Sequence, residues 1–450
     1  MTSLRADLRL AWELTRGSDR GEWWRVTLTA VGAALATGFA LAAVALASLR
    51  GGSYSLPVAS GLLNEPGTRS GVIAGLLLLL VPVLGFLGQC ARIGAVHRDR
   101  RLAGLRLAGA TPWQMRRIAA LETGLACLLG SAVATVFSVL LLLRLWDPTA
   151  LAWAGVALVA VAVPLLGAAA STLALRRVVA SPLGWVRRVA PRTGRGPGLL
   201  FLAGLLMVGT AALFALLGTS SAASNRPSAG LPLTMVGVVL AVGAGSIWLS
   251  GAVARGMGRL LAGRARSAAV LIAAERLRDD PWAAARTHAA VLLVTVVGTG
   301  FMGIREVLGD VVRSQRFAER ADYYLTGLNL TGAAVAVALA ITLSGLAVGT
   351  AESMATRRRG LAAQAAAGVP RAVLGRSLLL ETALPLAPAV LLAGLGGTAI
   401  GTWYALLGHR PVPWVTALVP LAVYAACLLA AATSLPLLGR SVRPGELRYA

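Results

Sequence analysis

The chain has 450 residues, of which 57% are hydrophobic and only 13% charged, and its mean hydropathy is +0.75. Soluble domains carry about 25% charged residues, so these values exclude an ordinary soluble protein. The net charge of +24 comes from 42 arginines without one lysine. This excludes a P-loop, which needs its lysine at the nucleotide phosphates, and a pyridoxal phosphate enzyme, which needs a lysine for its Schiff base.

Ten apolar stretches are long enough, at about 20 residues, to cross a bilayer as helices. In chain order they are 26–48, 71–91, 119–143, 151–175, 199–218, 231–254, 288–304, 329–351, 377–403 and 412–438. The first follows a charged segment and reads as a signal anchor. The sequence therefore predicts an all-α polytopic membrane protein with about ten transmembrane helices.

The arginines are shared unevenly between the two sides of these spans. With the N-terminus inside, the cytoplasmic segments hold 33 arginines and the outer segments hold nine. Because arginine-rich segments stay on the cytoplasmic side, we expect a multi-pass protein of a bacterial plasma membrane with both termini in the cytoplasm. We expect these positive charges to interact with the lipid bilayer and not with nucleic acid. The absence of lysine suggests a GC-rich, actinobacterial coding sequence.

The outer segments are short, at about 49–70, 144–150, 219–230, 305–328 and 404–411. In 305–328, the apolar residues Val307, Leu308, Val311, Val312 and Phe317 have approximate helical spacing. The seventh span is therefore expected to continue outward as an amphipathic helix. A solvated extension is the favoured interpretation, and a substrate-contacting surface is the alternative.

Two arginine-rich segments interrupt the apolar chain and resemble each other. Gly368 lies 259 residues after Gly109, and the same offset relates Arg117 to Arg376 and Glu122 to Glu381. A second pair of segments precedes spans one and seven, where an acidic turn is followed by tryptophan. We interpret each of these as an interfacial helix on the cytoplasmic leaflet, with an ordinary linker as the alternative.

These pairs predict a duplicated architecture. The first unit is 1–180, with its basic segment at 97–117, and the second is 268–450, with its basic segment at 356–376. A linker at 181–267 carries spans five and six. Six spans separate the two basic segments, and an even number keeps the orientation. The result is two parallel four-helix repeats joined by a two-helix linker.

The first basic segment can be interpreted residue by residue. Residues 101–108 suit a short helix, and Gly109 is placed as its terminator. Thr111 then caps a new helix, with Pro112 at its first position and Gln114 completing a capping box. This geometry predicts a helix across the cytoplasmic mouth and a sharp turn into the membrane. Such a helix can transmit a push from a partner; the alternative is a loop that only anchors topology.

Glu122 and Glu381 each lie just inside the cytoplasmic end of a span, where a carboxylate is costly unless it is paired or near water. A helix N-terminus and nearby arginines both favour a carboxylate there. Functional coupling and simple stabilisation of the helix end are two open interpretations.

No pattern of a catalytic or metal site is visible. Cys90, Cys127 and Cys427 lie in or beside spans without metal-ligand spacing, and the three histidines are at span ends, far apart in sequence. We therefore expect neither an enzyme nor a directly bound cofactor.

The segment RRLAGLRLAGATPWQMRRIAALETGL, from Arg100, resembles the signature of FtsX-like ABC transporter permeases, and RRRGLAAQAAAGVPRAVLGRSLLLETAL matches it more loosely. The phrase ADYYLTG, at 321–327, is similar to one that opens the outer domain of many relatives. The resemblance implies two FtsX-like repeats in a ten-span form like the Bce-type permeases, whereas MacB-type relatives carry one repeat. It departs from both because the outer segments are too short for a large extracellular domain.

The resemblance also implies a partner and a function. Separate ABC ATPase subunits, two copies per chain, would bind ATP and dock on the basic segments. The implied coupling residues are Arg100, Arg101, Arg106, Gly109, Ala110, Thr111 and Glu122 in the first copy, and Arg358, Arg359, Gly368, Val369 and Glu381 in the second.

The function implied is export of an amphipathic or lipophilic compound, such as an antimicrobial peptide, a drug or a lipid-like molecule. The alternative is a mechanotransmitting or sensory protein that signals across the bilayer, for which an extracytoplasmic accessory or sensor protein is an additional partner. A secondary transporter is disfavoured, since no midplane acid or histidine stands out.

Overall fold

The structure is a computed structural model that describes residues 20–49, 109–145, 148–179, 230–314, 321–407, 409–411 and 413–441, with scattered residues between 63 and 90. All regular structure in these ranges is helical, and eight of their helices are long and apolar enough to cross a membrane. The all-α polytopic fold class is confirmed. Of the remaining predicted spans, 71–91 is described only at scattered residues, and 199–218 lies outside the described residues.

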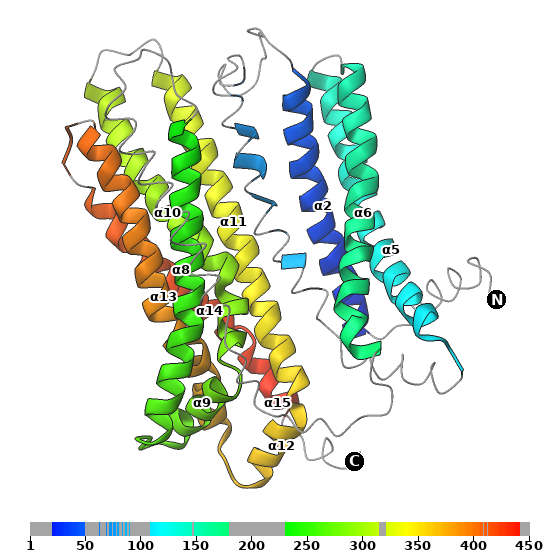
Figure 1. Ribbon diagram of the computed structural model, residues 1–450, viewed down its shortest axis with the longest axis vertical. Helices are drawn as coiled ribbons and strands as arrows, with labels where there is room; N and C mark the ends of the chain where they lie inside the picture. The colour runs from blue at the N-terminus through cyan, green and yellow to red at the C-terminus, as the bar shows by residue number, and fades with distance from the viewer. Residues whose placement is uncertain are drawn as a thin grey trace. The chain divides into compact units, whose positions relative to one another are not determined.

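The chain divides into two compact units, one made of residues 1–188 with 322–334 and the other of 189–321 with 335–450. The described helices of the N-terminal unit are α2 (Arg20–Ser48), α5 (Pro112–Leu145) and α6 (Ala150–Val179), which pack against one another (Figure 1). Gly130 of α5 brings this helix against the backbone of Ala30 in α2. The Ser131 hydroxyl donates to the Ala160 carbonyl, which joins α5 to α6.

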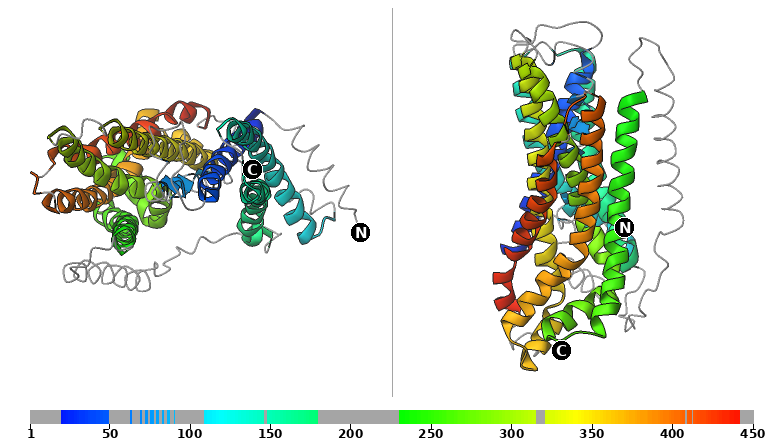
Figure 2. Two further views of the ribbon diagram at one scale, coloured as in Figure 1. Left: turned by 90° about the horizontal axis from the view of Figure 1, so that it is seen from above. Right: turned by 90° about the vertical axis from the view of Figure 1, so that its left-hand side faces the viewer.

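The C-terminal unit contains the other helices. These are α8 (Gly230–Ala262), α9 (Ala268–Asp279), α10 (Pro281–Ser314), α11 (Ala321–Thr356) beyond residue 334, α12 (Arg358–Ala366), α13 (Arg371–Leu407), η2 (Trp414–Ala417), α14 (Leu418–Ala432), η3 (Leu435–Leu437) and α15 (Leu438–Ser441). The long helices α8, α10 and α13 run side by side, and α14 packs on α13 (Figures 1 and 2).

Small residues bring α10 and α13 together at the centre of this unit. A Cβ atom added to Gly303 would lie 2.7 Å from the Cα of Gly401, and one added to Gly397 would lie 2.7 Å from the carbonyl oxygen of Val296. Apolar side chains of α10, α11, α13 and α14 fill the space beside this crossing. Because lipid tails are as apolar as these side chains, close packing of this kind is what holds membrane helices together.

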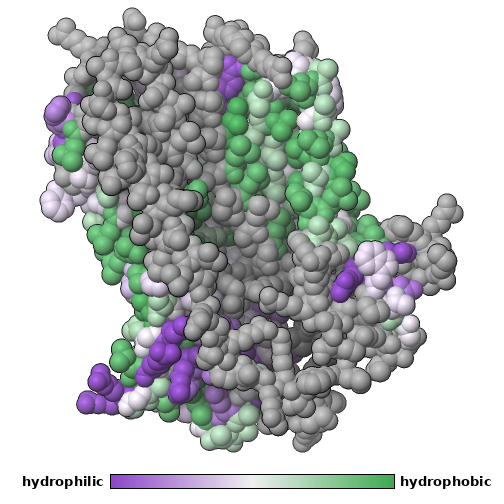
Figure 3. Space-filling view, viewed as in Figure 1, coloured by the Kyte–Doolittle hydropathy of each residue, from purple (hydrophilic) through white to green (hydrophobic). Residues whose placement is uncertain are grey.

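The surface of the N-terminal unit is suited to lipid. Large apolar side chains of α5 and α6 are exposed, among them Val133, Phe137, Leu158 and Leu165, and Figure 3 shows hydrophobic residues along these helices. Hydrophilic residues gather instead at the end of the C-terminal unit that carries α9 (Figure 3).

Two of the segments expected on the outer side are shorter than the hydropathy indicated. Helix α10 extends to Ser314 and α11 begins at Ala321, so most of the expected loop 305–328 is helical, and α13 extends to Leu407 into the expected loop 404–411. The continuation of span seven as a helix past residue 304 is confirmed. Its apolar face is packed, because Val307 and Val312 are buried, whereas Arg305 and Asp310 are exposed, as expected of an amphipathic helix. Phe317 lies outside the described residues. The phrase ADYYLTG forms the first turns of α11.

The expected interfacial helix before span seven is α9, while its counterpart before span one lies mostly outside the described residues. Ser267 caps α9 by accepting a hydrogen bond from the amide of Val270. Asp280 separates α9 from α10, which begins at Pro281; a residue before proline is forced away from helical geometry, so the chain turns here. The turn is anchored by Trp282, whose ring centre lies 5.8 Å from the guanidinium carbon of Arg255 in α8.

Candidate functional site

The turn between the first basic segment and α5 has the geometry that its sequence predicts. Gly109 has a φ of +93°, a left-handed conformation that glycine adopts without strain. The amide of Thr111 donates to the side-chain oxygen of Gln114 at 2.8 Å, and the amide of Gln114 donates to the Thr111 hydroxyl at 3.3 Å. This reciprocal pair is a capping box, and α5 begins at Pro112. Outside the described residues lies the segment 100–108, which contains Arg100, Arg101 and Arg106.

The second basic segment is described throughout, and α12 is its short helix. Gly368 has a φ of +90° and terminates α12. Its amide donates to the carbonyl of Ala365 at 3.0 Å, and the amide of Val369 donates to the carbonyl of Gln364 at 3.1 Å. These two bonds form a Schellman motif, which satisfies the carbonyl groups left over at the end of a helix. The chain then enters α13 at Arg371.

The two turns match at the predicted spacing. Gly109 and Gly368 share the left-handed conformation, and α5 and α13 begin three residues after them, at Pro112 and Arg371. The hydrogen bonds at the two turns differ: Thr111 and Gln114 form a capping box after Gly109, whereas Gly368 belongs to a Schellman motif. The shared geometry supports the wider duplication, which stays a prediction.

Changing Gly368 to alanine is expected to destabilise the end of α12 by about 1–2 kcal/mol, the cost of a left-handed conformation for a residue with a Cβ atom. Gly360 is the matched control: it lies inside the same helix, a Cβ atom there meets no atom within 4 Å, and alanine should stabilise α12 by about 0.5–1 kcal/mol. Amide hydrogen exchange across α12 should therefore speed up in Gly368→Ala and slow down in Gly360→Ala. Changes in the same direction would contradict the assigned geometry.

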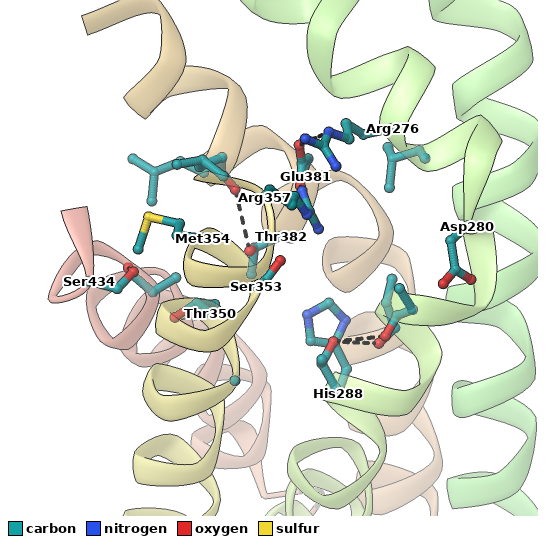
Figure 4. A pocket seen from close by; sticks show the side chains of 18 of the residues that line it. Arg276, Asp280, His288, Thr350, Ser353, Met354, Arg357, Glu381, Thr382 and Ser434 are labelled. Carbon is teal, nitrogen blue, oxygen red and sulfur yellow. Dashed lines mark hydrogen bonds and ion pairs between the residues drawn. The ribbon is translucent and has the colours of Figure 1, made fainter. Parts of the chain in front are cut away.

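Glu381 joins α9, α12 and α13 at the end of the C-terminal unit that carries α9. Its carboxylate lies in α13, one oxygen 2.8 Å from the Arg357 guanidinium at the start of α12 and the other 3.8 Å from Nε of Arg276 in α9 (Figure 4). Only 15% of the Glu381 side chain is exposed. Burial, and then the charge of Arg357, lower the pKa of Arg276. We refer to Arg276, Arg357 and Glu381 as the charge cluster.

An apolar cluster reinforces these ion pairs. Leu361 of α12 is buried with Met354 of α11, Leu374 of α13 and Leu438 of α15, and Ile272 of α9 packs against them. Side chains from five helices, α12 among them, thus meet in this cluster. A displacement of α12 must therefore disturb α9, α11 and α13 as well, because close-packed groups cannot move independently.

The face of α12 that points away from this cluster is exposed and made of small residues. Leu361 and Ala362 are buried, whereas Gly360, Ala363 and Ala366 are exposed, as are the following Ala367 and Gly368. Arg359 is exposed, Arg358 is partly exposed and donates from Nε to the carbonyl of Ala355, and Val369 packs on the apolar cluster. A ridge of small side chains bordered by arginines is a surface that a partner's backbone can approach closely.

The residues singled out in the first copy lie in the N-terminal unit. Ala110 is partly exposed, Thr111 is exposed, and Glu122 is buried in α5 with 6% of its surface exposed. In the second copy the structure brings Glu381 and Arg358 to the same end of the C-terminal unit. Arg276 and Arg357 are not among the site residues predicted from the sequence. In the sequence, Arg276 lies one helical turn before the acidic turn at the end of α9, and Arg357 is the first arginine of RRRG.

Within the described ranges, no group of histidine, cysteine, aspartate and glutamate is arranged to hold a metal ion.

Comparison with known proteins gives one family. Residues 73–183 match the family model described as FtsX-like permease C-terminal. This region includes the first basic segment, the capped turn at Thr111 and helix α5. A search of curated proteins finds no match. Residues 73–183 of this multi-pass membrane protein therefore form a domain of the FtsX-like family of ABC transporter permeases.

Proposed function

We propose that the chain is the permease subunit of an ABC exporter, in which ATP hydrolysis by separate ATPase subunits drives outward movement of an amphipathic or lipophilic compound. The proposal rests on α12, which exposes a ridge of small residues while its inner face is tied by ion pairs and apolar contacts to α9, α11 and α13. A force applied to this ridge therefore reaches the long helices α11 and α13 and the short helix α9.

In this proposal, α12 and the segment before Gly109 are coupling helices, each docking on one ATPase copy. Gly109, Ala110 and Thr111 in the first copy, and Gly368 and Val369 in the second, fix the turn from the coupling helix into the span. Arg100, Arg101, Arg106, Arg358 and Arg359 meet the ATPase. The end of the C-terminal unit that carries α9 and α12 faces the cytoplasm, as do both termini.

The ridge can be tested with the purified chain in nanodiscs and a candidate ABC ATPase from the same organism. In the double variant Ala363→Glu and Ala366→Glu, two carboxylates point from the exposed ridge into the proposed interface, where unpaired buried charges are strongly unfavourable. We expect ATPase binding at least about tenfold weaker, equivalent to about 1.4 kcal/mol, and loss of the change in ATP turnover.

The matched control is Ala268→Glu, the same substitution at an exposed position at the start of α9, where a helix N-terminus tolerates a carboxylate. It should bind the ATPase as the wild type does. An ATPase that binds the double variant normally would show that α12 is not the docking helix. A second assay, with the chain and the ATPase reconstituted in sealed vesicles, measures export of lipophilic peptides into the vesicle lumen and so separates transport from signalling. ATP turnover that responds to the chain without movement of a compound would favour the mechanotransmitting alternative.

A further inference from the structure

A cavity of about 310 Å³ lies behind the charge cluster, entirely within the C-terminal unit. It is bounded by α9, α10, α11, α13 and the chain between α14 and η3 (Figure 4). Ligand sites in proteins have volumes of about 300–1,000 Å³, so the cavity has room for a small molecule. Met354, Leu378, Leu379 and Leu435 give it an apolar wall.

Three of the hydroxyl groups that line the cavity offer acceptors rather than donors. Thr287, Thr350 and Ser434 each donate their proton to a carbonyl oxygen of the preceding turn, at distances of 2.6–3.1 Å. A hydroxyl group has one proton and two lone pairs. Since the protons are used within the chain's own backbone, the oxygen atoms present lone pairs to a ligand.

His288 adds an unsatisfied group. Only 2% of its surface is exposed, it lines the cavity, and its Nδ1 atom has no hydrogen-bond partner within the part of the chain that the structure describes. Figure 4 shows the imidazole ring on α10, across the cavity from Ser353 of α11. A buried polar atom without a partner is unfavourable, and a ligand in this cavity can supply the partner.

The charges around the cavity favour a cation over an anion. Three carboxylates line it, those of Asp279, Asp280 and Glu381, against two guanidinium groups. Both guanidinium groups are directed at Glu381. An anionic ligand would have to compete with the Glu381 carboxylate for the two arginines. A cationic ligand would instead be attracted by the carboxylates that line the cavity.

We infer that this cavity is a binding site for a small amphipathic amine, whose ammonium group donates to the hydroxyl oxygens and to His288 while its hydrocarbon part lies on the apolar wall. An ammonium group has three donors and no acceptor, which complements an acceptor-rich lining. The site goes beyond the proposed export function, and its occupancy requires no ATPase.

The probe is n-hexylamine, compared with n-hexanol and n-hexanoate, added to the full chain in phosphatidylcholine nanodiscs. The chain has three histidines, so the imidazole signals can be followed by NMR with isotope-labelled histidine. We expect a saturable shift of the His288 signal with hexylamine, at an affinity at least about tenfold higher than for the alcohol or the carboxylate.

Ser353→Leu is designed to fill the cavity from α11, and Ser344→Leu is the matched control on an exposed position of the same helix. The amine-dependent shift should disappear in the first variant and persist in the second. Photo-crosslinking of the wild type with an amine-bearing diazirine, competed by hexylamine but not by hexanol, should label α11 or α13 and tests the site without any substitution.

Four results would overturn the inference. Equal binding of hexanol would make the cavity a purely apolar site, and tighter binding of hexanoate would make it an anion site. Absence of any saturable shift and of competed crosslinking would mean that the cavity holds only water. Retention of amine binding by a folded Ser353→Leu protein would place the amine elsewhere.

Discussion

Replacing Gly397 by valine is expected to cause the largest loss of stability of any substitution considered for this protein. Even the first added carbon would lie 2.6 Å from the Cβ of Thr299 and 2.7 Å from the carbonyl oxygen of Val296. Backbone cannot yield as a flexible side chain can, so α10 and α13 must separate. Overpacking typically costs about 1–3 kcal/mol, and occasionally more; we expect the upper end or beyond.

The measurement is thermal unfolding of the detergent-solubilised chain, in which each kcal/mol lowers Tm by about 2–4 °C for a protein unit of this size. Gly375→Ala is the control in the same helix: a Cβ atom there first meets Leu435, at an ordinary 3.7 Å. It should leave Tm unchanged or slightly raised. If Gly397→Val unfolds at the temperature of the wild type, the two helices do not cross as closely as described.

Glu381→Ala is expected to loosen α9 and α12 together. The substitution removes both ion pairs of the charge cluster and leaves Arg276 and Arg357 close together, with like charges and largely buried. A hydrogen bond to a charged group contributes about 1.5–3 kcal/mol, so amide exchange in both helices should accelerate at least about tenfold. Hydrogen exchange measured by mass spectrometry reads the two helices separately.

The control for this prediction is Glu275→Ala, which breaks another ion pair of α9, between Glu275 and Arg278 at 3.5 Å. Both side chains there are about half exposed, and an exposed pair three residues apart on a helix contributes little. Exchange should barely change. Faster exchange in α9 alone after Glu381→Ala would show that the carboxylate does not hold α12. In the proposed exporter, Glu381→Ala should also bind the ATPase yet fail to alter its turnover.

Features that depend on neighbouring residues could be predicted from the sequence. The capping box needs only Thr111, Pro112 and Gln114, and the end of α12 needs a glycine at 368, because both motifs are closed by hydrogen bonds over a few residues. Most spans could likewise be found from local hydropathy. Their ends could not, since α10 and α13 continue as helices past their apolar parts.

Features that depend on residues distant in the sequence could not be predicted from it. The sequence indicated that Glu381 needs a partner, but one of its partners, Arg276, comes from a helix far earlier in the chain, and no local pattern selects it from the other arginines. The cavity beside His288 has the same origin, because five segments line it. The small exposed face of α12 was hidden for another reason: alanine and glycine favour neither side of a helix until the packing of Leu361 decides which face is buried.

The length of α13 bears on where this machinery lies with respect to the lipid. Its 37 residues span about 55 Å at 1.5 Å per residue, whereas the hydrocarbon layer of a bilayer is about 30 Å thick. Even a tilted helix of this length projects beyond the layer, and the polar residues near its start, from Arg371 to Glu381, indicate which end projects. The turn at Gly368 therefore stands within or past the headgroup region, where a water-soluble protein can reach it without entering the membrane.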